Sequence, residues 1–140
     1  MTNRAISFIV KDQNPLMLRP GDTVQTACQR MCERSVGAVL VTDAHAHLKG
    51  IFTGRDAVQV IARGGHPGEV QLSEVMTAKP DTIGPERTAL DALHMMCDGG
   101  YRHLPVVVDG KVVDIVSRTD FKGLELDHFE DEQSLWERIC

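Results

Sequence analysis

A short segment occurs twice in this chain at a nearly fixed spacing. GIFTGRD occupies residues 50–56, and DIVSRTD occupies residues 114–120. Each has two apolar residues, then a threonine or serine, then an arginine within the next two residues and a final aspartate. The upstream sequences also match, since LMLRPGDTVQTACQRMCERSVGA begins at Leu16 and DTIGPERTALDALHMMCDGGYRH begins at Asp81, an offset of 65. Self-similarity at a fixed period indicates a duplicated structural unit, so the two halves are expected to fold alike.

The first half predicts the element order β-α-β-β-α. Residues 16–18 form a short extended piece, and apolar residues then recur at helical spacing over residues 24–31. GAVLVT (residues 37–42) and HLKGIFT (residues 47–53) are short apolar runs separated by a brief turn, which predicts a hairpin of buried strands. AVQVIARGG (residues 57–65) follows the first aspartate and is expected to form a second helix.

The second half predicts the same element order. Residues 82–83 are the extended piece, and residues 89–96 have the helical spacing. HLPVVV (residues 103–108) and KVVDIVS (residues 111–117) predict the hairpin. FKGLELDHF (residues 121–129) is the counterpart of the second helix. The expected fold class is therefore α/β (α+β), with two β-α-β-β-α repeats.

With 140 residues, the chain is one domain or two small units that share a core, because a unit of about 60 residues is marginally stable alone. RGGHPGEV is rich in glycine and proline and predicts a linker. The expected boundaries are residues 5–62 for repeat 1, 63–71 for the linker, 72–126 for repeat 2 and 127–140 for an acidic C-terminal tail. The tail either packs on its own domain or makes a dimer or docking contact through its apolar residues, which are Phe129, Leu135, Trp136 and Ile139.

Composition excludes several classes of protein. The apolar fraction of 42% and the charged fraction of 25% are ordinary for a soluble globular chain. No run approaches 18 apolar residues, and the start MTNRAISFIVKDQNP lacks a secretory signal, so neither a membrane span nor export is expected. The formal net charge of −5 gives no basic surface for nucleic acid. The cysteines show no paired framework and are expected to be free thiols of a cytosolic protein; they are Cys28, Cys32, Cys97 and Cys140.

The repeated aspartates indicate a chemistry. An aspartate at a strand-to-helix junction can accept hydrogen bonds from both vicinal hydroxyls of a ribose. Thr53 and Ser117 lie three residues before Asp56 and Asp120, and their hydroxyls can donate to phosphate or sugar oxygens. The free N–H groups at a helix start also favour anions. The alternative is that the two aspartates only cap their helices.

The sequence resembles a tandem pair of cystathionine-β-synthase (CBS) domains, also called a Bateman module. The residues that carry the resemblance are SEVMTAKPDTI, YRHLPVV, GIFTGRD and DIVSRTD, and the resemblance covers residues 5–126. It implies two repeats related by pseudo-twofold symmetry. Because it covers nearly the whole chain, no catalytic domain is left over, and the chain is expected to be a stand-alone pair. It also implies two clefts that bind adenosine-containing ligands, and a homodimer formed mainly through helices.

In this family each cleft is built crosswise. The junction motif of one repeat meets the first strand and the helix-to-strand turn of the other repeat. Carried over to this sequence, cleft 1 contains Thr53, Arg55, Asp56, Thr82, Ile83, Tyr101, Arg102, His103 and Pro105. Cleft 2 contains Met17, Leu18, Val36, Gly37, Ala38, Ser117, Arg118, Thr119 and Asp120.

The two expected clefts differ in charge. Cleft 1 gathers Arg55, Arg102 and His103, which can neutralise a phosphate through charge-assisted hydrogen bonds. Cleft 2 has a glycine and an alanine at the positions of Arg102 and His103, which leaves Arg118 as its main cation. Asp114 also replaces the glycine expected at the start of the second motif, and its carboxylate would repel a phosphate unless the side chain points to solvent. If one nucleotide binds well, it is expected in cleft 1.

A metal site is an alternative for residues outside these clefts. His45 and His47 are two apart in a hairpin loop, and Cys28 and Cys32 are four apart on a helix, so together they could ligate zinc. The spacing is not that of a recognised ligand set, and Cys28 lies on the apolar helical stripe. We therefore expect buried structural thiols and no metal.

Two further classes of function remain as alternatives. An enzyme needs a nucleophile beside a base, and Thr53, Asp56 and His103 are better explained as groups that hold a ligand, so no catalysis is expected. A ligand-free interaction or dimerisation module would use the duplication only to build a surface. The sequence favours a cytoplasmic, non-catalytic sensor that binds AMP, ADP, ATP, NAD or S-adenosylmethionine and regulates an effector protein that the sequence does not identify.

Overall fold

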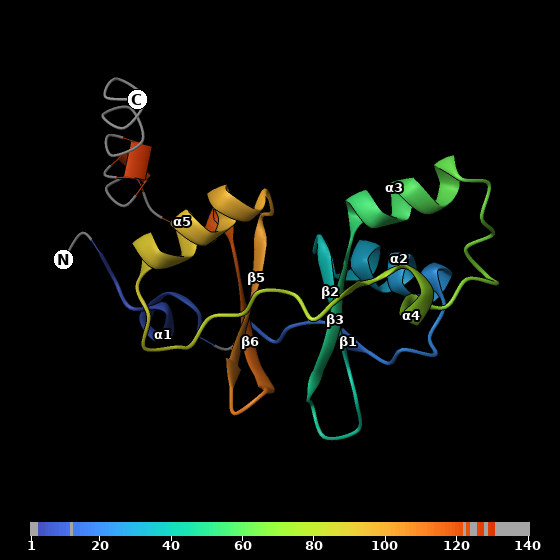
Figure 1. Cartoon of the computed structure of the whole chain (residues 1–140), viewed down its shortest axis with the longest axis horizontal. Helices are drawn as coiled ribbons and strands as arrows, with labels where there is room; N and C mark the ends of the chain where they lie inside the picture. The colour runs from blue at the N-terminus through green and yellow to red at the C-terminus, as the bar shows by residue number, and fades with distance from the viewer. Residues whose placement is uncertain (1–2, 12, 122, 124–125, 128, 131–140) are drawn as a thin grey trace. The chain divides into compact units, whose positions relative to one another are not determined.

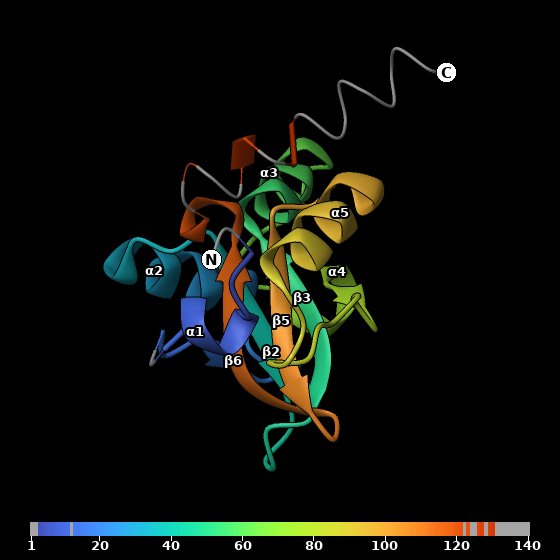
Figure 2. The same ribbon diagram turned by 90° about the vertical axis from the view of Figure 1, so that its left-hand side faces the viewer.

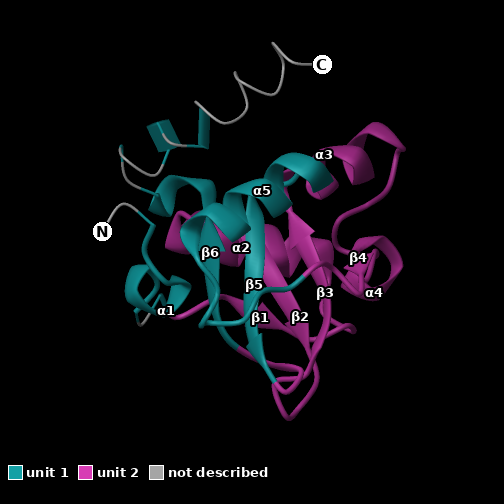
Figure 3. Cartoon of the chain, turned by 60° about the vertical axis from the view of Figure 1, so that its left-hand side comes forward, with its two compact units in different colours: residues 1–13, 82–108, 113–140 teal, residues 14–81, 109–112 magenta. Residues whose placement is uncertain are grey.

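The computed structural model of the chain consists of short helices and strands (Figures 1 and 2). Its residues group by contact into two compact units, which are coloured separately in Figure 3. Unit 1 consists of residues 1–13, 82–108 and 113–140, and unit 2 consists of residues 14–81 and 109–112. The structure describes residues 3–11, 13–121, 123, 126–127 and 129–130.

Unit 2 contains a four-stranded sheet with the strand order β1-β2-β3-β4. The β1–β2 pair is parallel, whereas the β2–β3 and β3–β4 pairs are antiparallel. Its strands are β1 (Met17–Leu18), β2 (Ala38–Thr42), β3 (Leu48–Thr53) and β4 (Thr77–Ala78), and its helices are α2 (Val24–Arg34), α3 (Gly54–Ala62) and α4 (Leu72–Val75). The element order predicted for the first half is present, and α4 and β4 follow it as additions that the sequence did not predict.

Helix α2 forms because its apolar residues recur every three or four positions and so lie on one face. Val24, Ala27 and Met31 are the buried residues of that face. The Thr23 hydroxyl oxygen accepts the Thr26 N–H at 3.1 Å, which caps the first turn. The buried face of α2 packs into a cluster with strand residues of the sheet, which include Val39, Val41 and Phe52.

Strand β4 lies very close to the middle of β3. Gly50 pairs with Ala78 across the two strands. A Cβ atom at Gly50 would lie 2.5 Å from Sδ of Met76 and 2.8 Å from the carbonyl oxygen of Thr77. The first repeated motif therefore begins with glycine because a neighbouring backbone approaches it closely.

Unit 1 contains a two-stranded sheet and one long helix. Its elements are α1 (Ile6–Ile9), α5 (Ala89–Gly99), β5 (His103–Val108), β6 (Lys111–Ser117) and the 3₁₀ turn η1 (Arg118–Asp120). Helix α5 is capped by Thr88, whose hydroxyl oxygen accepts the Asp91 N–H at 3.3 Å, and it contacts β5 (Figure 2). Ile83 makes a parallel bridge to Val106, so the predicted first extended piece is also present in this half.

The core of unit 1 combines residues from distant parts of the sequence. The Ile6 N–H donates to the Arg87 carbonyl at 2.8 Å, and the Ala89 N–H donates to the Arg4 carbonyl at 2.8 Å. These bonds hold α1, which the sequence did not predict, beside the start of α5. The fully buried members of the cluster include Ile6, Ala92, Leu93, Leu104 and Val116.

The tip of the β5–β6 hairpin belongs to unit 2. The Leu48 N–H donates to the Gly110 carbonyl at 3.1 Å, and the Val112 N–H donates to the Ala46 carbonyl at 2.9 Å. The compact units therefore have different boundaries from the sequence repeats. Residues 63–81 fold with unit 2, and residues 1–13 fold with unit 1.

The mixed α+β fold class predicted from the sequence is confirmed. In the second half, η1 comes directly before the segment 121–129 where a helix was expected, and the described residues Gly123, Leu126, Asp127 and Phe129 of that segment are helical. The predicted helix over residues 121–129 and the tail over residues 127–140 fall partly or mostly outside the described residues. Within the described part of the chain, no helix is both long enough and apolar enough to cross a bilayer.

Candidate ligand-binding half-sites

The predicted site residues are divided between the two units. Unit 2 carries Met17, Leu18, Val36, Gly37, Ala38, Thr53, Arg55 and Asp56. Unit 1 carries Thr82, Ile83, Tyr101, Arg102, His103, Pro105, Ser117, Arg118, Thr119 and Asp120. We describe these two half-sites separately.

The half-site of unit 2 is centred on the junction between β3 and α3. Oδ2 of Asp56 accepts the Thr53 N–H at 2.9 Å and lies 3.2 Å from the Thr53 hydroxyl oxygen. The Gly54 N–H donates to the Gly37 carbonyl at 3.3 Å, which connects the junction to the turn before β2. Arg55 is exposed. The junction therefore presents a fixed carboxylate beside a solvent-facing arginine.

The half-site of unit 1 is centred on the end of β6. Oδ2 of Asp120 accepts the Ser117 N–H at 2.8 Å, and its Oδ1 accepts from Nε2 of Gln13 at 3.2 Å. The hydroxyls of Ser117 and Thr119 are 2.8 Å apart. Both junctions thus use the same backbone-to-carboxylate hydrogen bond. The capping role considered from the sequence is present in each.

Arg102 and His103 lie close to this second junction. The Arg118 N–H donates to the Arg102 carbonyl at 3.0 Å, which places the start of β5 beside the end of β6. Arg102 is exposed, and the guanidinium carbon of Arg118 lies 5.5 Å from the centre of the Phe129 ring. Unit 1 therefore brings together residues that the sequence assigned to different clefts, Arg102 and His103 to cleft 1 and Arg118 and Asp120 to cleft 2.

The ionisation of His103 reflects these neighbours. Burial lowers the pKa of His103 below its ordinary value of 6.5, and the Arg102 guanidinium lowers this pKa further. The Asp120 carboxylate acts in the opposite direction and only partly offsets them. The imidazole of His103 is therefore neutral near pH 7, and it gains a charge only in more acidic solution than an exposed histidine requires.

Several predicted cleft residues have buried side chains. Leu18, Ala38, Ile83 and Pro105 are all buried. The ring of Tyr101 lies over Gly99 and packs on the core of unit 1. Only the backbone of the four buried residues remains for a ligand to contact. By contrast, the side chains exposed at the half-sites include Met17, Val36, Arg55, Arg102 and Thr119.

Asp114 does not point to solvent. Its exposed fraction is 8%, and its Oδ1 accepts the Ile115 N–H at 2.9 Å. The alternative that this side chain points to solvent is therefore wrong, because the side chain lies on the buried face of β6. The alternation of side chains along a strand could have predicted this burial. Val112 and Val116 lie two residues away on either side of Asp114, on the same face of β6, and are also buried.

A small cavity adjoins the first junction. It has a volume of about 150 Å³ within unit 2, and Asp56, Gln59 and Arg63 contribute its polar lining. Pockets for small molecules usually have volumes of 300–1,000 Å³, so this cavity is too small for a nucleoside. The sequence did not indicate it, because Gly65, Val70 and Val75 reach it only through the fold of the linker and α4.

The histidines of the β2–β3 loop have a local partner. Oδ1 of Asp43 accepts the His45 N–H at 2.8 Å, and its Oδ2 lies 3.2 Å from Nδ1 of His47. Desolvation acts to raise the pKa of Asp43, but the hydrogen bonds from the loop and the imidazole of His47 lower it to about 2. Among the described residues, no three His, Cys, Asp or Glu side chains are placed to hold a metal ion.

Comparison with known proteins identifies the family. Residues 8–63 and residues 72–126 each match the family model of the CBS domain. The CBS domain-containing protein CBSCBSPB2 of Arabidopsis thaliana is 44% identical over 105 residues, which are 74% of this chain and 20% of the plant protein. The chain thus spans about a fifth of the length of this relative. This chain belongs to the CBS domain family, and the resemblance found in its sequence is confirmed.

Solved structures share its fold. A CBS domain protein from Pyrobaculum aerophilum in complex with AMP aligns with a TM-score of 0.83 at 19% identity, covering 91% of this chain and 99% of that one. A CBS domain pair in complex with 5′-methylthioadenosine and S-adenosyl-L-methionine aligns with a TM-score of 0.77 at 21% identity, covering 84% of this chain and 95% of that one. At these identities the likeness establishes the CBS pair fold.

Proposed function

We propose that this chain is a cytosolic, non-catalytic regulatory module that binds an adenosine-containing ligand and changes its shape or self-association in response. The ligand class comprises AMP, ADP, ATP, NAD and S-adenosylmethionine. The proposal is supported by membership of the CBS family and by two structural neighbours solved with adenosine derivatives. Cys28, Cys32 and Cys97 are in the thiol form and not in disulfides, which agrees with a reducing compartment.

The observation that carries this proposal is the pair of aspartates at the ends of β3 and β6. In each, Oδ2 accepts a backbone N–H from three residues earlier, so the direction of the carboxylate is fixed. A fixed carboxylate can accept hydrogen bonds from the two vicinal hydroxyls of a ribose, as acidic residues do in dinucleotide-binding folds. Capping and ribose binding are compatible in one residue, because a carboxylate has about four acceptor positions.

We assign the ribose to Asp56 in cleft 1 and to Asp120 in cleft 2, with the other lining residues as expected from the sequence. Arg102 is the proposed phosphate ligand, because its guanidinium is exposed and can form two parallel hydrogen bonds to phosphate oxygens. Sensing requires more than binding, since a ligand shifts an equilibrium only by its differential affinity for the two states.

A second copy of this chain is the proposed partner for α3. The helix exposes two large apolar side chains three residues apart, Val58 at 67% and Ile61 at 61%. Family resemblance implies association through helices. Val58→Asp combined with Ile61→Asp should then convert a dimer to a monomer in sedimentation velocity, whereas a wild-type chain that sediments as a monomer at high concentration would contradict the assignment.

The test of the proposed function is a binding panel. Thermal unfolding of the chain is followed with each of the five ligands and with GMP as a control for the base. At least one adenosine ligand should raise the melting temperature, and the doubly substituted chain Asp56→Asn with Asp120→Asn should lose that shift. No shift with any of the five ligands would favour the ligand-free interaction module instead.

The same samples distinguish a sensor from an enzyme. A sensor leaves the ligand chemically unchanged, so chromatography of ATP and NAD after prolonged incubation should recover both intact. Conversion that depends on the chain, and that disappears in the Asp56→Asn variant, would contradict the non-catalytic assignment.

A further inference from the structure

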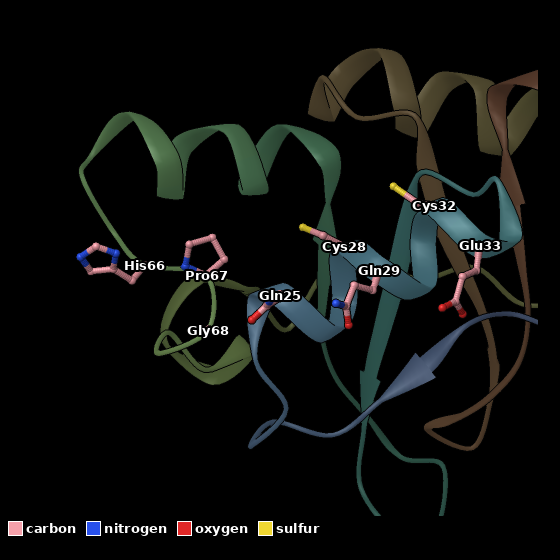
Figure 4. Close-up of a pocket in the computed structure, with 8 residues that line it drawn as sticks. All are labelled: Gln25, Cys28, Gln29, Cys32, Glu33, His66, Pro67 and Gly68. Carbon is pink, nitrogen blue, oxygen red and sulfur yellow. The ribbon is translucent and has the colours of Figure 1, made fainter.

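A groove in unit 2 shares no lining residue with the junction motif at residues 50–56. It has a volume of about 870 Å³ and runs between helix α2 and the linker that follows α3 (Figure 4). The linker is anchored to the start of the helix, because the Gln25 N–H donates to the Pro67 carbonyl at 3.0 Å and the Val24 N–H donates to the Val70 carbonyl at 2.9 Å. The groove is therefore a fixed feature of unit 2.

Two thiols lie together on this groove. Cys28 and Cys32 are four residues apart on α2, and both line the groove. In Figure 4 their sulfur atoms project from one side of the helix, whereas the side chains of Gln29 and Glu33 project from the other side. Cys28 is partly buried and Cys32 is exposed, so the expectation of buried structural thiols is wrong for this pair. Burial raises the pKa of Cys28, and the nearby Cys32 thiol raises it further.

The spacing of the two thiols suits one soft metal ion. Helical residues four apart have Cβ atoms about 5–6 Å apart. A thiolate binds a d10 ion at about 2.3 Å, so two thiolates on opposite sides of one ion are separated by roughly 4.6 Å. Rotation about the two Cα–Cβ bonds brings the sulfur atoms to this separation without a change in the helix.

The number of ligands limits the kind of metal. The part of the chain that the structure describes holds no set of three His, Cys, Asp or Glu side chains placed for one ion, so the pair offers two ligands only. Two thiolates in line are the coordination favoured by soft monovalent d10 ions, whereas zinc in proteins takes four ligands.

We propose that Cys28 and Cys32 form a two-thiolate site for a soft monovalent d10 ion of the copper(I) type, exposed to solvent along the groove of unit 2. Binding forms two sulfur–metal bonds and releases two thiol protons to the solvent, with no transfer of electrons. The site is independent of the proposed nucleotide ligand, since it shares no residue with either junction motif.

The experiment uses silver(I) as a probe that does not change oxidation state. The reduced full-length chain is titrated with silver(I) against a competing thiol, and bound metal is counted by native mass spectrometry. One ion should bind tightly. Cys28→Ser and Cys32→Ser should each weaken it by roughly 100-fold or more, because the second thiolate on the same helix acts at a high effective concentration. Cys97→Ser is the matched control, since Cys97 is an exposed cysteine on α5, and it should bind like wild type.

A second measurement uses the unaltered chain, so that the proposal can still be tested if the cysteine variants fail to fold. One equivalent of silver(I) should protect Cys28 and Cys32, and not Cys97 or Cys140, from alkylation by iodoacetamide, as read from the masses of peptides. Wild-type affinity in either the Cys28→Ser or the Cys32→Ser chain would overturn the proposal. Protection of Cys97 or Cys140 in place of the α2 pair would overturn it as well.

Discussion

At the end of β3 the chain passes into the nine-residue helix α3, whereas at the end of β6 it passes into the three-residue turn η1. Both junctions hold an aspartate by a backbone N–H, at 2.9 Å in the first and 2.8 Å in the second. Their surroundings differ, since the first carries Arg55 and the second lies beside Arg102 and His103. The two repeats share the backbone-to-carboxylate hydrogen bond but differ in the basic side chains around it. The backbone geometry of a junction can therefore be kept while the ligand that it prefers changes.

The two carboxylates also differ in what they already bind. Oδ1 of Asp120 already accepts from Gln13, which leaves fewer acceptor positions for a ribose at that junction. The two hydrogen bonds that Thr53 donates to Asp56 both use Oδ2. The aspartate in the junction of unit 2 therefore has more acceptor positions available for ribose hydroxyls. The junction of unit 1 has more basic side chains beside it. Four predictions test this comparison, in order of decreasing expected effect.

The largest effect is expected where the two motifs begin. Gly50→Asp places a Cβ atom 2.5 Å from Sδ of Met76 and buries a carboxylate, so it should lower the free energy of unfolding by about 3 kcal/mol or more. Asp114→Gly removes the interactions of this side chain, which include its hydrogen bond to the Ile115 N–H, and should cost about 1–2 kcal/mol. Urea denaturation of both variants measures the difference. If Gly50→Asp does not fold, Gly50→Ala should still cost about 1–3 kcal/mol. Equal costs at the two positions would contradict the close approach of β4.

The second prediction concerns the ribose. Asp56→Asn should weaken adenosine-ligand binding by roughly ten- to more than a hundredfold, about 1.5–3 kcal/mol, because a charged acceptor is lost. Asp120→Asn should have the smaller effect. Asparagine can still accept the capping N–H, so the melting temperatures of the free chains serve as the control and should change little. Isothermal calorimetry measures the ligand affinity of both variants. Equal losses of affinity in Asp56→Asn and Asp120→Asn would contradict the prediction that Asp56 contributes more.

The third prediction concerns the phosphate. Arg102→Ala should weaken AMP by about tenfold or more and leave adenosine unchanged, because adenosine has no charge for the guanidinium to bind. Arg102→Lys should recover only part of the loss, since an ammonium cannot reproduce a bidentate contact. Arg55→Ala is the matched variant in unit 2. The ratio of AMP to adenosine affinity is the measurement, and an unchanged ratio in Arg102→Ala would show that this arginine is structural.

The smallest effect is a pH dependence at His103. Its folded-state pKa lies below the unfolded value of about 6.5, mainly through burial and then through Arg102. As the pH is lowered through 6.5, His103 is protonated in the unfolded chain before it is protonated in the folded chain. The contribution of this residue to the free energy of unfolding therefore falls, and it stops falling once the pH is below the folded-state pKa. Arg102→Ala should raise the pKa of His103 toward 6.5. Titration of the imidazole by NMR in both chains measures this change, and a wild-type pKa of 6.5 or above would contradict it.

Much of the fold could be predicted from local patterns. The helical spacing of Val24, Ala27 and Met31 predicted α2, because residues three or four apart lie on one face of a helix. In the structure these three residues are buried. Helices α1 and α4 and strand β4 could not be predicted in this way. They are two to four residues long, and their positions depend on distant partners, such as the Arg87 carbonyl for Ile6.

The residue types of the candidate site could be predicted from the sequence, but their positions relative to one another could be predicted only in part. The repeated hydroxyl and aspartate pairs indicated two equivalent junctions, and the structure contains both. The nearness of Arg102 to the second junction follows from the register of the β5–β6 hairpin, because the first residues of one strand lie beside the last residues of the other. The assignment of residues to crosswise clefts came from family resemblance alone, and it remains a prediction.

The discontinuity of unit 1 has a consequence for synthesis. Most of unit 2 is one stretch, residues 14–81, which can fold soon after it leaves the ribosome. Ile6 and Val10 are made before unit 2 but pack in a cluster with residues of α5 and β5, such as Leu93 and Leu104, which are made after it. Ile6 and Val10 therefore lack their packing partners until the second repeat has been translated. A ribosome that pauses between the two repeats should hold a folded unit 2 with an N-terminal segment available to chaperones.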